Sequence, residues 1–131
     1  MDTRQWYESL NKPSWAPEPE VFGRVWSIIY PIIFIVNIYV LVLLYNGKIN
    51  WLIALPFWLN LFFNFLYTPV QFGLKNQSLS SIVILLVFFT IIWCMIAIFP
   101  YSKWLTIAYI PYLVWVGIAS VLQINLWWLN R

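Results

Sequence analysis

Residues 25–47 have the sequence VWSIIYPIIFIVNIYVLVLLYNG, which contains no charged side chain, and this stretch decides the fold. Three further charge-free runs follow at residues 49–74, 76–102 and 104–130, each separated from the one before by a single lysine. A bilayer core about 30 Å thick is crossed by about 20 helical residues that rise about 1.5 Å each. All four runs are long enough, so the sequence predicts four membrane-spanning segments.

The composition agrees with a membrane protein rather than a water-soluble one. Of the 131 residues, 63% are hydrophobic and 8% are charged, with a mean hydropathy of +0.82, which leaves too little polar surface for a monomer in water. A transmembrane β-barrel would need alternating polarity, whereas these runs are apolar throughout. We therefore expect an all-α, multi-pass transmembrane helical bundle. Its four spans are predicted at about residues 25–45, 51–72, 79–99 and 104–128.

The chain divides into residues 1–24, predicted as a polar loop segment with all four acidic side chains, and a transmembrane helical bundle over residues 25–131. Short connections between spans make neighbouring helices antiparallel, which places both termini on one side of the membrane. Lysines and arginines are more numerous on that side, and positive charge marks the cytoplasmic face. We expect cytoplasmic N- and C-termini. The cations of that side are Arg4, Lys12, Arg24, Lys75 and Arg131, against Lys48 and Lys103 on the other.

Several function classes are disfavoured by what the chain does not contain. It has no histidine and one cysteine, Cys94, so the usual general base and the usual ligands of zinc or haem iron are missing, and no metal site is expected. The basic residues are single and lie near span ends, which argues against nucleic acid as a partner. No carboxylate or lysine lies deep in a span, which argues against an ion-coupled transporter.

One face of the second span is polar. Asn60, Asn64, Tyr67 and Gln71 follow one another at spacings of four, three and four residues, which places them on one side of a helix. Polar side chains are costly in contact with lipid, so this face should point into the bundle. Two interpretations stay open: the side chains hold helices together, or they form the hydrogen-bonding wall of a binding site.

Two other spans combine aromatic, small and amide side chains on one face. These residues are Trp26, Tyr30, Ile33 and Asn37 in the first span and Trp115, Ala119 and Gln123 in the fourth. The third span is almost entirely aliphatic and is expected to form a wall. A neutral cavity of this composition suits a flat, largely apolar ligand that stacks on rings and makes a few hydrogen bonds.

Aromatic and proline motifs occur in order along the chain. They are Trp6-Tyr7, Leu10, Lys12-Pro13, Trp15, Pro17, Phe22-Gly23 and Val25-Trp26, then Asn64, Thr68-Pro69 and Phe72-Gly73, then Pro111-Tyr112-Leu113, Trp115-Val116, Ala119, Trp127 and Leu129-Asn130. In this order they resemble the TspO/MBR family, the tryptophan-rich sensory or translocator proteins. The resemblance covers essentially the whole chain.

The resemblance implies a five-helix membrane fold in which the loop between the first two helices folds over a ligand cavity. This chain begins where that loop begins, so we expect it to lack the family's first helix and to form a homodimer, or to use another partner, that covers the open side. Three positions depart from the family pattern: Glu18 stands where a second proline is usual, Gln123 where asparagine is usual, and Tyr67 where tryptophan is common.

The resemblance also implies a function, the binding of porphyrins such as protoporphyrin or haem, with no obligatory cofactor. The site residues that it implies are Tyr7 and Pro17 from the loop, Trp26 from the first span, Asn64, Tyr67, Gln71 and Phe72 from the second, and Trp115, Ala119 and Gln123 from the fourth. Trp26 and Trp115 are the candidates for redox or stacking roles. Two alternatives stay open: a light-dependent porphyrin-degrading enzyme, and a structural subunit that completes its bundle with a partner.

Overall fold

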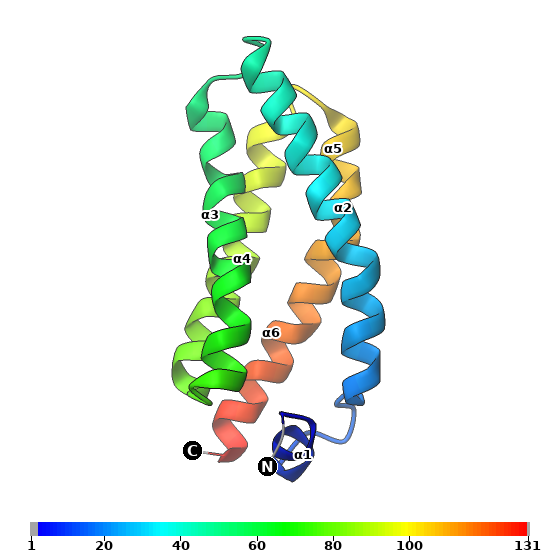
Figure 1. Ribbon diagram of the computed structural model, residues 1–131, viewed down its shortest axis with the longest axis vertical. Coiled ribbons are helices and arrows are strands. Elements are labelled where there is room, and N and C mark those ends of the chain that lie inside the picture. The colour runs from blue at the N-terminus through cyan, green and yellow to red at the C-terminus, as the bar shows by residue number, and fades with distance from the viewer. Residues whose placement is uncertain (1–2, 131) are drawn as a thin grey trace.

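The computed structural model describes the backbone of residues 3–130, and the side chains of these residues except Thr3, Arg4, Pro19 and Phe72. In this part of the chain every regular element is a helix. The elements in chain order are α1 (Thr3–Ser9), α2 (Pro19–Tyr45), α3 (Trp51–Thr68), the π-helix η1 (Pro69–Gly73), α4 (Gln77–Ile98), α5 (Lys103–Ala108) and α6 (Ile110–Asn130). The long helices run antiparallel along one axis, and α1 lies at the same end as the C-terminal end of α6 (Figure 1).

The predicted four-span membrane bundle is confirmed. The helices that are long and apolar enough to cross a membrane cover Glu20–Tyr45, Trp51–Gln71, Gln77–Ile98 and Lys103–Asn130. The first helix begins before the predicted residue 25, because Pro19 stands in its first turn, where a fixed φ favours helix and the missing N–H costs nothing. The segment 1–24 therefore contains the short helix α1 and the first turns of α2, not only loop.

Three helices start at side-chain caps. Asn50 accepts a hydrogen bond from the backbone N–H of Ile53 at 3.2 Å at the start of α3, and Asn76 accepts one from Leu79 at 3.0 Å at the start of α4. Ser102 caps α5 in the same way. Each cap satisfies one of the backbone donors that a first helical turn leaves unpaired, so the polar connections of the sequence define where the spans begin.

Prolines change two spans that the sequence predicted as continuous. The fourth span is broken at Tyr109 into α5 and α6, because Pro111 has no N–H to donate to the carbonyl one turn earlier. The second span leaves α-helical geometry at Pro69 and ends in η1, where the N–H of Leu74 bonds to the carbonyl of Pro69 at 3.0 Å, five residues back. In Figure 1 α5 lies beside α2, while α6 slants toward the lower end of α3 and α4.

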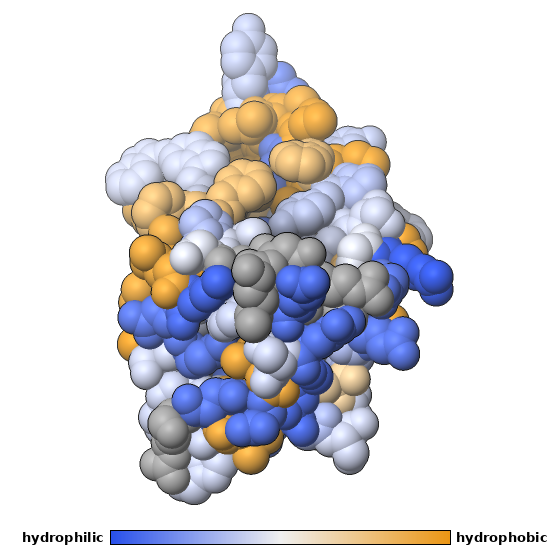
Figure 2. All heavy atoms as spheres, turned by 60° about the horizontal axis from the view of Figure 1, so that its bottom comes forward, coloured by the Kyte–Doolittle hydropathy of each residue, from blue (hydrophilic) through white to orange (hydrophobic). Residues whose placement is uncertain are grey.

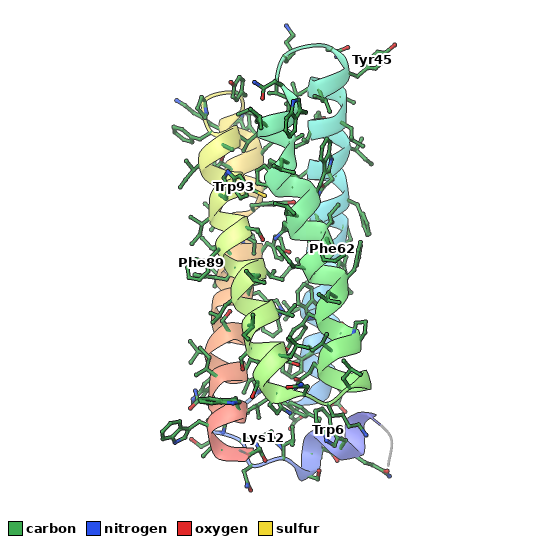
Figure 3. The ribbon with its side chains drawn as sticks, turned by 90° about the vertical axis from the view of Figure 1, so that its left-hand side faces the viewer. Trp6, Lys12, Tyr45, Phe62, Phe89 and Trp93 are labelled. Atoms are coloured by element: carbon green, nitrogen blue, oxygen red, sulfur yellow. The ribbon has the colours of Figure 1, made fainter. Side chains whose placement is uncertain are left out.

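Helix α4 is the centre of the bundle, since it packs closely on both α3 and α6, whereas α2 contacts the other helices less. Val87, Ile91 and Cys94 of α4 are completely buried. The outer surface is apolar, and Phe62, Phe89 and Trp93 point away from the bundle (Figure 3). An apolar exterior around a tightly packed centre is what contact with lipid requires, so the protein is an integral membrane protein.

The end of the bundle that carries α1 is more polar than the sides of the bundle. Figure 2 shows that hydrophilic residues gather at the end that carries α1, below a more apolar surface. The segment around α1 is attached to the last turn of α6: the backbone N–H of Asn11 donates to Asn130 Oδ1 at 3.0 Å, and Asn130 Nδ2 donates to the carbonyl of Asn11 at 2.8 Å. These two bonds help to hold α1 across one end of the bundle.

Candidate functional site

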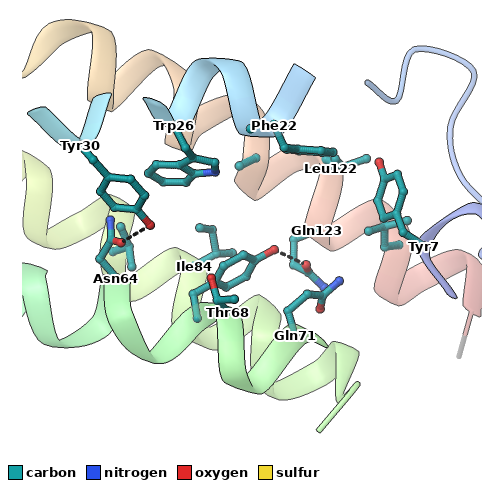
Figure 4. A pocket seen from close by; sticks show the side chains of 15 residues that line it. Tyr7, Phe22, Trp26, Tyr30, Asn64, Thr68, Gln71, Ile84, Leu122 and Gln123 are labelled. Carbon is teal, nitrogen blue, oxygen red and sulfur yellow. Dashed lines mark hydrogen bonds between the residues drawn. The ribbon is translucent and has the colours of Figure 1, made fainter. Parts of the chain in front are cut away.

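A cavity of about 480 Å³ lies between α2, α3, α4 and α6 and is bordered at one end by α1 (Figure 4). Pockets that bind small molecules and cofactors typically measure about 300–1,000 Å³, so its size suits an organic ligand. Its walls are formed by Tyr7, Phe22, Gly23, Trp26, Tyr30, Asn64, Tyr67, Thr68, Gln71, Ile84, Val87, Ala119, Leu122, Gln123 and Leu126.

The wall formed by α2 is aromatic. Trp26 stacks on Tyr30 with ring centroids 5.0 Å apart and planes 25° from parallel. Trp115 of α6 packs edge-on behind this pair, 6.4 Å from Trp26 and 5.6 Å from Phe22. Such edge-to-face contacts add stability beyond buried area, so Trp115 holds the ring that the cavity presents.

The opposite wall, formed by α3, carries amides and hydroxyls at successive turns. Asn64 Oδ1 lies 3.4 Å from the Tyr30 hydroxyl, and Asn64 Nδ2 donates to the buried Tyr112 hydroxyl at 2.6 Å. One turn further on, the Tyr67 hydroxyl donates to Gln123 Oε1 at 2.7 Å, a bond drawn as a dashed line at Gln123 in Figure 4. Polar side chains from α2, α3 and α6 therefore meet across the cavity.

Gln71 and Gln123 mark the end of this polar wall nearest α1. Both side chains are 1% exposed. Gln123 Nε2 donates to Gln77 Oε1 at 2.6 Å, whereas Gln71 Oε1 is buried and has no hydrogen-bond partner among the described residues. A buried acceptor without a partner costs free energy, and such groups are uncommon in native proteins unless something else satisfies them.

Tyr7 of α1 lies at the end of the cavity. Its ring meets Phe22 edge-on at 5.6 Å, its hydroxyl donates to the carbonyl of Pro17 at 3.1 Å, and the Lys12 ammonium lies 5.0 Å from its ring centroid. Burial raises the pKa of Tyr7 to about 12, so its hydroxyl is neutral at physiological pH. The ring thus forms an uncharged cover over one end of the cavity.

Seven of the residues predicted for the site line the cavity, and their ligand-binding role stays a prediction. They are Tyr7, Trp26, Asn64, Tyr67, Gln71, Ala119 and Gln123. Pro17 and Trp115 do not line it: Pro17 supports Tyr7 from outside, and the indole of Trp115 lies behind Trp26 and Phe22. The side chain of Phe72 lies outside the described residues.

The list of predicted site residues omitted eight further residues that line the cavity. They are Phe22, Gly23, Tyr30, Thr68, Ile84, Val87, Leu122 and Leu126. Helical spacing had already placed Tyr30 on the same face as Trp26. Phe22 lies one turn before Trp26, so the same signal was usable for it. Ile84 and Val87 belong to the aliphatic span, where no residue type distinguishes the side that faces the cavity from the side that faces lipid.

The comparison with known proteins identifies the family. A profile of the TspO/MBR family matches residues 1–129. The tryptophan-rich protein TspO of Bacillus cereus is 33% identical over 92 residues (66% of this chain), and the tryptophan-rich sensory protein of Cereibacter sphaeroides is 33% identical over 94 residues (71% of this chain). The matches span 56% and 53% of the length of these two relatives. Protein CrtK of Rhodobacter capsulatus is 32% identical over 126 residues, which cover 95% of this chain and 78% of that protein. Since the family profile runs across nearly the whole chain, the protein belongs to the TspO/MBR family.

Proposed function

We propose that this protein binds a flat, largely apolar ligand, such as protoporphyrin or haem, in the cavity between its helices. The observation that supports this most strongly is the pairing of two unlike walls across one cavity of about 480 Å³. The Trp26 and Tyr30 rings offer a stacking surface, and Asn64, Tyr67 and Gln71 offer hydrogen bonds opposite it. Stacking and a few placed polar groups are the contacts that such a ligand needs.

A ligand explains the polar face of α3 better than helix association alone. Asn60, on the same face, is completely buried and bonds to Thr90 Oγ1 at 3.0 Å, so it holds α3 and α4 together. Gln71 lies beside the cavity and leaves its acceptor unused. These contacts support helix association for Asn60 and ligand binding for Gln71.

The wider role that we propose is sensing or handling of tetrapyrroles under stress. The Cereibacter relative is named a tryptophan-rich sensory protein, which supports a sensory function for this chain. A homodimer is part of the proposal, because α2 and α3 contact each other little and both expose aromatic side chains. Light scattering of the purified protein in detergent tests the dimer, and a strict monomer that binds ligand normally would exclude it.

The test of binding is a titration of protoporphyrin into the purified protein in lipid nanodiscs, followed by tryptophan fluorescence. We expect saturable quenching, with the affinity lowered about 2- to 13-fold in Trp26→Phe, as the loss of 0.5–1.5 kcal/mol from an aromatic contact implies. Trp93→Phe is the matched control, because Trp93 points to lipid (Figure 3). Unsaturable quenching that is equal in the wild type, Trp26→Phe and Trp93→Phe would contradict the proposal.

Light-dependent porphyrin degradation is a second candidate, favoured by the contact between Trp26, which lines the cavity, and Trp115 behind it. Adjacent indoles beside a bound porphyrin can donate electrons to its excited state. We expect porphyrin absorbance to fall only under light and oxygen, and more slowly in Trp26→Phe. If porphyrin absorbance falls at the same rate when free tryptophan replaces the protein, an enzymatic role is rejected.

A further inference from the structure

We propose that the polar wall of the cavity selects an uncharged ring group that carries an N–H or O–H donor, because its hydrogen-bond network turns fixed acceptor atoms toward the ligand. This inference rests on the proposed function, since it names the chemistry of the ligand that the same cavity takes. Tyr112 and Asn60 act as positioning residues, because neither lines the cavity but together they set the orientation of Asn64.

The direction of the network is set by backbone carbonyls of α4, which can only accept. The Thr90 hydroxyl lies 2.8 Å from the carbonyl of Leu86 and 2.9 Å from that of Val87, so its single proton is used there. Asn60 lies 3.0 Å from Thr90 Oγ1 and 3.3 Å from the carbonyl of Val87. Two acceptors therefore face the same atom of the Asn60 amide, and that atom must be Nδ2.

The remaining bonds follow in sequence toward the cavity. Asn60 Oδ1 accepts from the Tyr112 hydroxyl at 3.0 Å, which uses the only proton of that hydroxyl. The Tyr112 oxygen must then accept from Asn64, and Nδ2 of Asn64 lies 2.6 Å from it. Asn64 consequently presents its carbonyl oxygen, Oδ1, on the cavity side. Only the Tyr30 hydroxyl approaches that oxygen among the described residues, at 3.4 Å, which is long for a bond between O–H and O (Figure 4).

A second network reaches the same result from the other end. Gln123 Nε2 faces Gln77 Oε1 at 2.6 Å and the backbone carbonyl of Gln77 at 3.5 Å, so Gln123 Oε1 is left to accept from Tyr67. The proton of Tyr67 is used in that bond, and its oxygen offers only lone pairs to the cavity. None of the described side chains that line the cavity is cationic, so a carboxylate placed against these oxygens would be buried without a partner among them.

Three tricyclic probes of nearly equal shape test the inference. Carbazole carries an N–H, dibenzofuran replaces it with an acceptor oxygen, and fluorene replaces it with a methylene group. Binding is measured by equilibrium dialysis of the protein in detergent against matched empty micelles, which cancels partition into detergent. We expect carbazole to bind about tenfold more tightly than dibenzofuran, a difference of about 1.4 kcal/mol.

Variants separate the acceptor from the residues that hold it. Asn64→Leu should remove the preference for carbazole over dibenzofuran. Tyr112→Phe should lower the preference at least threefold, because the Asn64 amide is then free to turn. Tyr109→Phe is the matched control: it removes another buried hydroxyl of the same region, which bonds to Asn37 at 3.1 Å and takes no part in the network. The preference should be unchanged in Tyr109→Phe.

Equal affinities of the wild-type protein for all three probes would overturn the inference while leaving the proposed function standing, provided that protoporphyrin still binds. A carbazole preference that survives in Asn64→Leu would overturn it as well, and one that survives in Tyr112→Phe would remove the positioning role. If neither protoporphyrin nor any probe binds, the proposed function itself fails. The wild-type comparison needs no variant, so an unstable mutant cannot obscure the result.

Discussion

Ala119 shows how a small residue can leave room for a ligand. It lies one turn after Trp115 and one turn before Gln123, is 9% exposed, and lines the cavity. The alternative role for a small residue in a membrane helix is close approach between helices, and in that case enlargement would disturb folding. The cavity beside Ala119 favours the first role.

Ala119→Leu should therefore weaken ligand binding more than it weakens the fold. Overpacking costs about 1–3 kcal/mol, which corresponds to about a 5- to 150-fold loss of protoporphyrin affinity. Ala54→Leu is the comparison, because Ala54 is completely buried in the core away from the cavity. This substitution should lower the melting temperature instead of the ligand affinity. Titration and thermal melting of the same samples distinguish the two. A lowered melting temperature of Ala119→Leu, or a protoporphyrin affinity equal to that of the wild type, would show that this face packs against a helix.

Tyr7 gives the end of the cavity near α1 a dependence on alkaline pH. Burial raises its pKa to about 12, above the value of 10 in an unfolded chain, so the folded state favours the neutral hydroxyl. This contribution to stability is complete below pH 10 and is lost as the pH rises toward 12. Plots of melting temperature against pH for wild type and Tyr7→Phe should run parallel up to pH 10. Above pH 10 they should converge, since phenylalanine does not ionise and only the wild type loses this contribution. Curves that stay parallel to pH 12 would mean that Tyr7 is not buried in solution.

At the scale of the elements, an asparagine pair is one of the contacts that fix the position of α1. Asn11 and Asn130 exchange two hydrogen bonds between the segment after α1 and the end of α6. Tyr7, on α1, borders the cavity, so this attachment also holds the cover over the ligand. The helix itself has only seven residues and would not be stable alone.

Asn130→Ala should release the cover and speed ligand dissociation. Two lost hydrogen bonds at about 0.5–1.5 kcal/mol each predict a rise of about 5- to 150-fold in the dissociation rate if both are lost in full. Asn125→Ala on the same helix is the control, because the Asn125 side chain donates to the carbonyl of Val121 one turn away, within α6. Stopped-flow measurement of protoporphyrin release gives the dissociation rate for both variants. An unchanged rate in Asn130→Ala would show that α1 does not retain the ligand.

For the whole molecule, the distribution of charge predicts its orientation in the membrane. Lys12, Arg24 and Lys75 lie toward the end with α1, and Lys48 and Lys103 lie at the other end. By the positive-inside rule the end with α1 faces the cytoplasm. In a Cys94→Ser background, a membrane-impermeant maleimide should label Lys48→Cys in intact cells and Ser14→Cys only after permeabilisation. Labelling of Ser14→Cys from outside would reverse the orientation.

The sequence by itself determined that the chain crosses a membrane four times as helices, because span length and apolar composition are properties of local sequence. It also identified the polar faces of α2, α3 and α6, since helical spacing alone brings Asn60, Asn64, Tyr67 and Gln71 to one side. Family motifs added the expectation that these faces meet around a ligand. The exact limits of the helices were less predictable, because Pro69 and Pro111 act through backbone bonds to residues a turn away.

Only the tertiary structure decided which groups pair and which face the cavity. Trp115 lies behind Trp26 because α6 approaches α2 there, and Ile84 and Val87 face the cavity because α4 lies between α3 and α6. The direction of the Asn60, Tyr112 and Asn64 bonds depends on a carbonyl of α4 that no residue type in the sequence reveals. Hydrogen-bond polarity is a property of contacts between distant segments, and that is why the chemistry of the cavity emerges only in the folded bundle.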